Sequence, residues 1–229
     1  MDNVNGRFNG RDGAFNDRGG ALAAVVGLGA ALAAGGCAVL EPSASSFNPP
    51  PPGSTFTRVE NNTGSFGKGR RELQVTIGER TWNGMDVVTF ASAQRTGLWN
   101  RNGRLVALVS PADKPILTWD PPDGGHGFRF PLTVGKTWDE SARMTTPNGK
   151  VLPHENSCRV EGREEVNVPA GTFMTFKVHC TSPRGLEMTS WYAPGPGLIV
   201  KQIQKRSENN PFGGAGTHEE QIVSIDLKQ

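Results

Sequence analysis

Apolar and polar residues alternate over most of the C-terminal two thirds of the chain. Leu73, Val75 and Ile77 alternate with polar neighbours, which is the period-2 pattern of a strand with one buried face. Turn signals such as Asn83-Gly84 and Asn102-Gly103 separate short segments of this kind. No segment after residue 40 repeats apolar residues at helical spacing over three turns. We therefore expect an all-β domain, a single antiparallel curved sheet of roughly 8–11 strands shaped as a half-barrel or a sandwich.

One hairpin can be predicted in more detail than the others. Residues 169–171, Pro-Ala-Gly, place proline and glycine where a type I turn favours them. Pairing the flanking strands about this turn places Cys158 opposite Cys180. It also places Val160 opposite Val178 on the same apolar face. A three-residue loop would instead make the cysteines diagonal neighbours, and the same face would stay apolar.

Cys158 and Cys180 could form a disulfide, remain free thiols or ligate a metal. Cysteines that face each other across a hairpin favour a disulfide in an oxidising compartment. A metal site formed together with His154 and His179 is one alternative. Adjacent strand residues point to opposite faces, so His179 and Cys180 diverge. We therefore predict a disulfide between Cys158 and Cys180 and no metal site.

The N-terminal region follows a different pattern. An apolar stretch at residues 21–34 leads into Gly35-Gly36-Cys37, and a Pro- and Ser-rich segment follows at residues 41–53. This is the layout of a bacterial lipoprotein precursor, in which the cysteine carries palmitate or a similar acyl chain and becomes the new N-terminus. The predicted parts are a signal peptide that forms a helix, a lipid-anchored tether and a β domain, at residues 1–36, 37–56 and 57–229.

Two other readings of the leader stay open. The protein could be secreted in soluble form after a cut near residues 31–33, or it could keep an uncleaved anchor. Each of the three alternatives puts residues 54–229 outside the cytoplasm. The lipoprotein interpretation predicts the periplasmic side of the bacterial cell envelope, and Ala38 after the cysteine favours the outer over the inner membrane.

Composition and motifs argue against several classes of function. The chain has 24 Lys and Arg against 22 Asp and Glu, too small an excess to suggest a nucleic-acid partner. No G-x-S-x-G elbow occurs, and the pair His154-Glu155 lacks the second histidine of the zinc-protease motif. We therefore expect no catalytic residues, no cofactor and no metal.

Three segments carry a resemblance to a known group. They are residues 130–138 (FPLTVGKTW), 168–173 (VPAGTF) and 191–201 (WYAPGPGLIVK). In order and spacing they resemble the TapB-like and related domains of unknown function, a group of uncharacterised bacterial envelope domains, over roughly residues 98–205. The resemblance implies a curved half-barrel similar to the LolA and LolB lipoprotein carriers. The group offers no catalytic residue to carry over.

These features together predict a non-enzymatic binding module, for acyl chains or another extended apolar ligand. A structural or assembly factor that pairs with envelope proteins through sheet edges is the alternative, and an enzyme is the least favoured. The expected partners are the membrane, through the lipid anchor, and lipid or envelope proteins. Strand alternation points to five ligand-lining side chains: Val160, Met174, Phe176, Val178 and Trp191.

Overall fold

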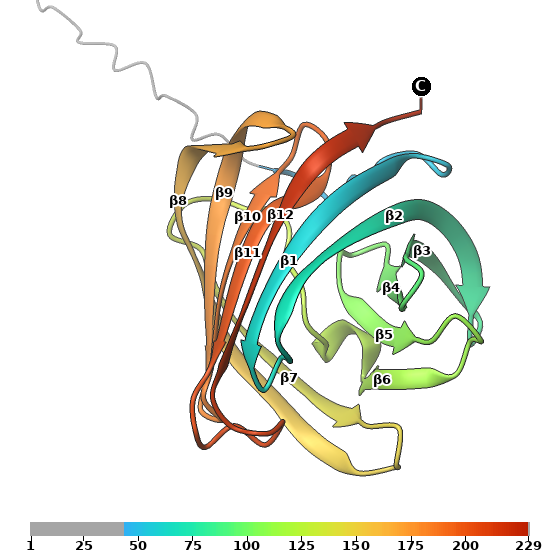
Figure 1. Ribbon diagram of the computed structural model, residues 1–229, viewed down its shortest axis with the longest axis vertical. Coiled ribbons are helices and arrows are strands. Elements are labelled where there is room, and N and C mark those ends of the chain that lie inside the picture. The colour runs from blue at the N-terminus through green and yellow to red at the C-terminus, as the bar shows by residue number, and fades with distance from the viewer. Residues whose placement is uncertain (1–43, 229) are drawn as a thin grey trace, which may run out of the picture. The chain divides into compact units, whose positions relative to one another are not determined.

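Twelve antiparallel strands follow one another around a closed barrel in the computed structural model, which describes residues 44–228 (Figure 1). The strands are β1 (Thr55–Gly64), β2 (Gly69–Trp82), β3 (Met85–Ala91), β4 (Thr96–Asn100), β5 (Leu105–Val109), β6 (Pro115–Asp120), β7 (Thr137–Thr145), β8 (Val151–Val168), β9 (Gly171–Ser182), β10 (Leu186–Ala193), β11 (Leu198–Arg206) and β12 (Gly216–Asp226). A short 3-10 helix, η1 (Pro122–Gly124), lies in the loop between β6 and β7. The prediction of an all-β, antiparallel domain is confirmed.

The barrel closes because the first strand pairs with the last. β1 pairs with β2 on one side and with β12 on the other, where Asn62 lies opposite His218. Each described strand therefore has two neighbours. Some strands extend past a neighbour, as β2 does at residues 69–75, which have no partner on β3. The expected half-barrel or sandwich of about 8–11 strands is wrong, because alternation within a segment cannot show that two strands at opposite ends of a domain pair. The predicted signal helix, at residues 1–36, lies outside the described residues.

Alternating side chains explain which residues fill the barrel. Along β7, Trp138, Glu140, Ala142 and Met144 are buried, while the residues between them are exposed or only partly buried. Successive side chains of a strand point to opposite faces, so these four point into the barrel. Three of them are apolar, as a core requires. Glu140 is the exception, and its surroundings are described below.

The hairpin of β8 and β9 has the predicted pairing at its cysteines. Cys158 lies opposite Cys180 and Val160 opposite Val178. The two cysteines form a disulfide, with their Cα atoms 4.1 Å apart. A β-bulge at Glu161 then changes the register by one residue.

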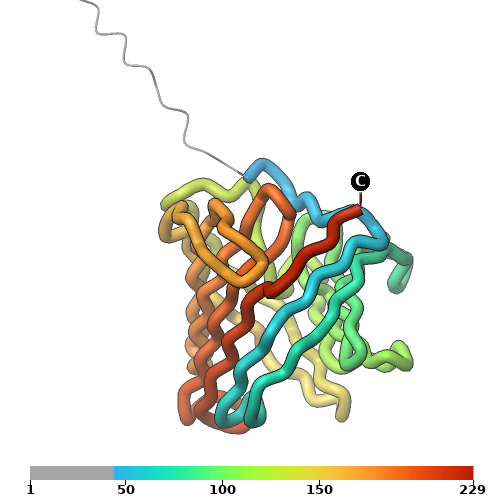
Figure 2. Tube along the Cα trace, turned by 45° about the horizontal axis from the view of Figure 1, so that its top comes forward, coloured from blue at the N-terminus to red at the C-terminus, as the bar shows by residue number. Residues whose placement is uncertain are grey.

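One end of the barrel is covered by residues that precede β1 (Figure 2). Ala44 pairs with Leu132 of the β6–β7 loop in an isolated bridge. The Phe47 ring lies 6.2 Å from both the Trp99 ring and the Phe130 ring, measured between centroids. The described part of the predicted tether therefore packs against the barrel. The segment before it, which contains the predicted lipidation site, lies outside the described residues.

Packing inside the barrel is uneven. On the side formed by β7 to β10, a close-packed cluster includes Trp138, Val160, Phe176, Val178 and Tyr192. The rest of the interior is less completely filled and leaves a cavity, whose lining includes residues of all twelve described strands. Residues 44–228 contain no helix with the length and apolar character needed to cross a membrane.

Candidate functional site: an interior cavity

The barrel encloses a cavity of about 440 Å³. This volume lies within the range of small-molecule sites, roughly 300–1,000 Å³. Aromatic and aliphatic side chains from most of the strands, from the segment before β1 and from the β6–β7 loop form a large part of its wall. These apolar lining residues include Phe47, Phe56, Phe90, Trp99, Leu105, Leu108, Leu117, Trp119, Phe128, Met144 and Leu152.

A buried carboxylate anchors the first of two polar groups at the cavity wall. The Glu140 cluster consists of Arg104, His126, Glu140, His154 and Asn156. Glu140 Oε1 accepts a hydrogen bond from the Gly127 N–H at 3.1 Å and lies 3.4 Å from Arg104 Nη1. Its Oε2 accepts from Asn156 Nδ2 at 2.6 Å and lies 3.0 Å from His154 Nε2. Both carboxylate oxygens are therefore fully engaged, as a buried charge requires.

The charge of Glu140 is compensated by its neighbours. Burial by itself would raise the pKa of Glu140, but His126 and His154 beside it and the charge of Arg104 outweigh burial. The pKa of Glu140 is therefore well below its ordinary value. Burial lowers the pKa of the Arg104 guanidinium, and the charge of Glu140 opposes this effect. The result is an ionised pair whose positive and negative charges balance inside the barrel.

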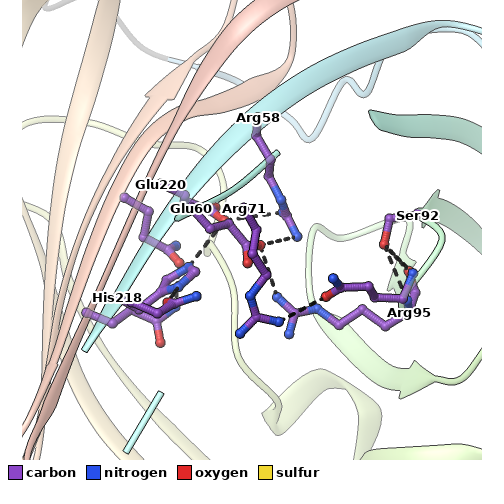
Figure 3. A network of polar contacts seen from close by, with 11 residues as sticks. Arg58, Glu60, Arg71, Ser92, Arg95, His218 and Glu220 are labelled. Carbon is purple, nitrogen blue, oxygen red and sulfur yellow. Dashed lines mark hydrogen bonds and ion pairs between the residues drawn. The ribbon is translucent and has the colours of Figure 1, made fainter. Parts of the chain in front are cut away.

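The second polar group lies where β1 meets β12 (Figure 3). The Glu220 cluster consists of Arg58, Glu60, Arg95, His218 and Glu220. Arg58 bridges the two carboxylates, with Nη2 3.0 Å from Glu60 Oε1 and Nη1 3.3 Å from Glu220 Oε2. Arg95 Nη2 approaches Glu60 Oε1 at 3.5 Å. The two carboxylates are thus matched by two guanidinium groups.

His218 completes this cluster. Its Nδ1 lies 2.6 Å from Asn62 Oδ1 and its Nε2 lies 3.3 Å from Glu220 Oε2. Burial opposes ionisation of Glu220, but the charge of Arg58 and the hydrogen bond with His218 outweigh it and lower the pKa of Glu220 to about 2. Glu220 is therefore ionised at neutral pH.

Both clusters contain side chains of the kinds that bind metal ions in other proteins. The ligand atoms of His126, Glu140 and His154 lie within 4.8 Å of one another, and so do those of Glu60, His218 and Glu220. Imidazole and carboxylate are zinc ligands. Each carboxylate, however, already has an arginine as its counter-charge. The arginines supply the positive charge that a cation would bring, so we interpret both clusters as charge-balanced networks.

The pair of Glu140 and His154 also has the geometry of a carboxylate-oriented general base. Such a base acts on a nucleophile within hydrogen-bond reach. In the part of the chain that the structure describes, no hydroxyl or thiol is hydrogen-bonded to the ring of His126, His154 or His218. The described residues therefore show no activated nucleophile in the cavity.

The five side chains predicted to line a ligand site lie elsewhere. Val160, Phe176 and Val178 are buried in the close-packed cluster on the other side of the barrel. Trp191 points away from the interior, because its neighbour Tyr192 lines the cavity. Met174 is 45% exposed. None of the five lines the cavity, because alternation indicates the buried face but not which part of an interior is filled.

The misplaced residues lie on β9 and β10. On β9 the alternation breaks at Phe176, so that Thr175 is buried and Met174 is exposed. Trp191 is covered from outside the barrel wall, where its Nε1 donates a hydrogen bond to Glu164 Oε1 at 2.6 Å. The predicted lipidation site, Cys37, lies outside the described residues.

The polar lining residues were not predicted as site residues. Along β1, Arg58, Glu60 and Asn62 are polar at every second position, and along β12 His218 and Glu220 are likewise two apart. Such an alternation is usually the solvent face of a strand. One signal could have identified these residues. A strand with polar residues on both faces must direct one polar face into the interior of the domain.

Comparison with known proteins gives a distant structural likeness. No protein-family model matches the chain, and no curated protein sequence matches it. A solved structure from Bacteroides fragilis NCTC 9343, a protein with a YmcC-like fold inferred to be exported, is 20% identical, with a TM-score of 0.43 over 80% of this chain and 99% of that chain. The hypothetical lipoprotein YmcC from Escherichia coli (K12) is 15% identical, with a TM-score of 0.43 over 78% of this chain and 87% of that chain. The resemblance to TapB-like domains stays a prediction, and the half-barrel that it implied is wrong.

Proposed function

We propose that the barrel is a non-enzymatic binding module of the bacterial cell envelope that holds an extended apolar ligand, such as an acyl chain, in its interior cavity. The observation that carries the proposal is the cavity with its extended apolar wall. Part of the interior is close-packed, and the rest leaves about 440 Å³ between aromatic and aliphatic side chains and the polar clusters described above. An apolar cavity of this size exposes surface that a hydrophobic ligand would cover.

The alternative of an assembly factor that pairs through sheet edges loses its support. A free edge offers unpaired N–H and C=O groups to another chain. Each strand from β1 to β12 is paired on both sides in the described structure. An added strand could therefore pair only where one strand extends past its neighbour, as β2 does at residues 69–75.

The test is uptake of a fluorescent fatty acid by the purified protein. Leu108 lines the cavity, so Leu108→Trp should fill part of the space and weaken uptake at least about tenfold, which corresponds to about 1.4 kcal/mol of binding free energy. Leu227 is 41% exposed, and Leu227→Trp serves as the matched control with unchanged uptake. Thermal unfolding of both variants checks the fold. Wild-type protein that binds no apolar probe would refute the proposal.

A further inference from the structure

Three arginines gather at one end of the cavity. Turns alternate between the two ends of an up-and-down barrel, so the turns after β1, β9 and β11 lie at the same end (Figure 2). Arg71, Arg184 and Arg206 all line the cavity at this end. Arg206 Cζ lies 3.8 Å from the ring centre of Phe66, in the turn after β1.

Contacts between the loops hold this end together. Asn210, in the loop after β11, donates a hydrogen bond from Nδ2 to the Arg184 carbonyl oxygen at 3.2 Å. Arg206 Nη1 donates to the Ser65 carbonyl oxygen at 3.4 Å. Arg71 Nη1 donates to Gln94 Oε1 at 3.3 Å. The guanidinium groups of Arg71 and Arg206 are thus held by neutral oxygen atoms.

The three arginines differ from the other arginines of the cavity in their counter-charges. Arg58 and Arg95 lie beside Glu60, as described above. By contrast, Arg71, Arg184 and Arg206 form no ion pair with a carboxylate among residues 44–228.

The charge balance of the wall follows from this difference. Five arginines line the cavity, against three glutamates: Arg58, Arg71, Arg95, Arg184 and Arg206, with Glu60, Glu155 and Glu220. The excess of two positive charges falls at the end where the arginines have no acidic partner. Burial lowers the pKa of the Arg206 guanidinium, and a nearby anion would offset that cost.

The apolar wall reaches the same end. Phe212, in the loop after β11, packs against the apolar cluster that contains Trp119, Met144 and Leu152. The same ring lies 5.3 Å from Arg206 Cζ. A chain that lies along this wall therefore brings one end within reach of the guanidinium. The opposite end of the cavity is formed by apolar residues such as Phe47 and Phe128.

Resting on the proposed function, we propose that the ligand is a single-chain amphiphile with an anionic headgroup, a carboxylate or a phosphate. Arg184 and Arg206, with Arg71 beside them, hold the headgroup. The chain lies along the apolar wall toward Trp119. Guanidinium groups bind carboxylates and phosphates through charge-assisted hydrogen bonds, which are stronger than neutral ones.

The experiment measures displacement of the fluorescent fatty acid by four competitors with the same C16 chain. These are hexadecanoate, hexadecyl phosphate, hexadecanol and hexadecyltrimethylammonium. We expect the two anions to compete at least about tenfold better than the alcohol or the cation, since a charge-assisted hydrogen bond is roughly twice as strong as a neutral one. The better of the two anions distinguishes a free fatty acid from a phosphate-bearing lipid.

The variant Arg184→Gln/Arg206→Gln should abolish the preference for anions while hexadecanol competes as before. Arg71→Gln, at an exposed position, should reduce the preference without a folding defect. Arg159→Gln, exposed on β8 and outside the cavity lining, is the matched control and should leave it unchanged. Equal competition by all four compounds in the wild type would overturn the headgroup proposal and leave the proposed function standing. Failure of every compound to bind would overturn the proposed function.

Discussion

Replacing Glu140 by Gln removes one charge from a fully buried ion pair. Arg104 Nη1 lies 3.4 Å from Glu140 Oε1, and the two side chains are 3% and 0% exposed. Glutamine fills nearly the same space and keeps an acceptor for the Gly127 N–H. The substitution therefore leaves the guanidinium of Arg104 buried without a counter-charge.

The expected cost follows from that burial. Removing one partner of a buried ion pair costs about 3–5 kcal/mol, because the remaining charge is uncompensated. In a domain of this size each kcal/mol lowers Tm by about 2–4 °C, so Glu140→Gln should lower Tm by roughly 10 °C at pH 7. The double variant Arg104→Met/Glu140→Gln removes both charges. It should recover part of the loss, and a double-mutant cycle then gives the coupling energy.

Urea unfolding followed by tryptophan fluorescence measures the effect, with Glu79→Gln as control. Glu79 pairs with Arg101 at 2.7 Å, but the two side chains are 42% and 55% exposed. An exposed pair of this kind contributes little to stability, because water screens it. If Glu140→Gln proves as stable as Glu79→Gln, burial does not govern the energy of the pair and the reasoning fails.

Acid stability, the disulfide and the N-terminal cysteine give three more expected outcomes. The pKa of Glu220, lowered from 4.5 to about 2, corresponds to roughly 3 kcal/mol that is present above pH 4.5 and lost as the pH falls toward 2. In Glu220→Gln the unfolding free energy should depend less on pH between 4.5 and 2. Wild-type protein that is equally stable at pH 3 and pH 6 would contradict the lowered pKa of Glu220. The variant Cys158→Ala/Cys180→Ala should lose roughly 3 kcal/mol in the chain-entropy model, because the bond closes a loop of sequence separation 22; unchanged urea unfolding after reduction would argue against this. Cys37→Ala should move the protein from the membrane fraction to the soluble fraction, and soluble wild-type protein would overturn the lipidation prediction.

The β8–β9 hairpin shows how far local sequence pattern reaches. Pairing about the turn also predicts Glu161 opposite Lys177. The two side chains do form an ion pair, with Lys177 Nζ 2.9 Å from Glu161 Oε2. Gly162, however, is the residue opposite Lys177, because Glu161 is the extra residue of a bulge. A bulge changes the register by one residue and has no compositional signal of its own in this strand.

The cavity could not be predicted from the same pattern. Arg58 and Glu60 on β1, and His218 and Glu220 on β12, have the alternation of residues that face water. They meet because the first strand pairs with the last, and no local pattern encodes a pairing between distant segments. The sequence therefore predicted the all-β fold class and the β8–β9 hairpin. It did not predict that closure of the barrel places these polar side chains in the interior.

Native mass spectrometry of the protein purified from bacterial membranes tests most directly whether the barrel carries an amphiphile. We predict a species heavier than the polypeptide by one single-chain anionic lipid, which is released when the protein unfolds. The same species should be reduced in Leu108→Trp, because Leu108 lines the cavity. Wild-type protein that shows only the polypeptide mass, and that stays unliganded after incubation with hexadecanoate, would contradict the central claim.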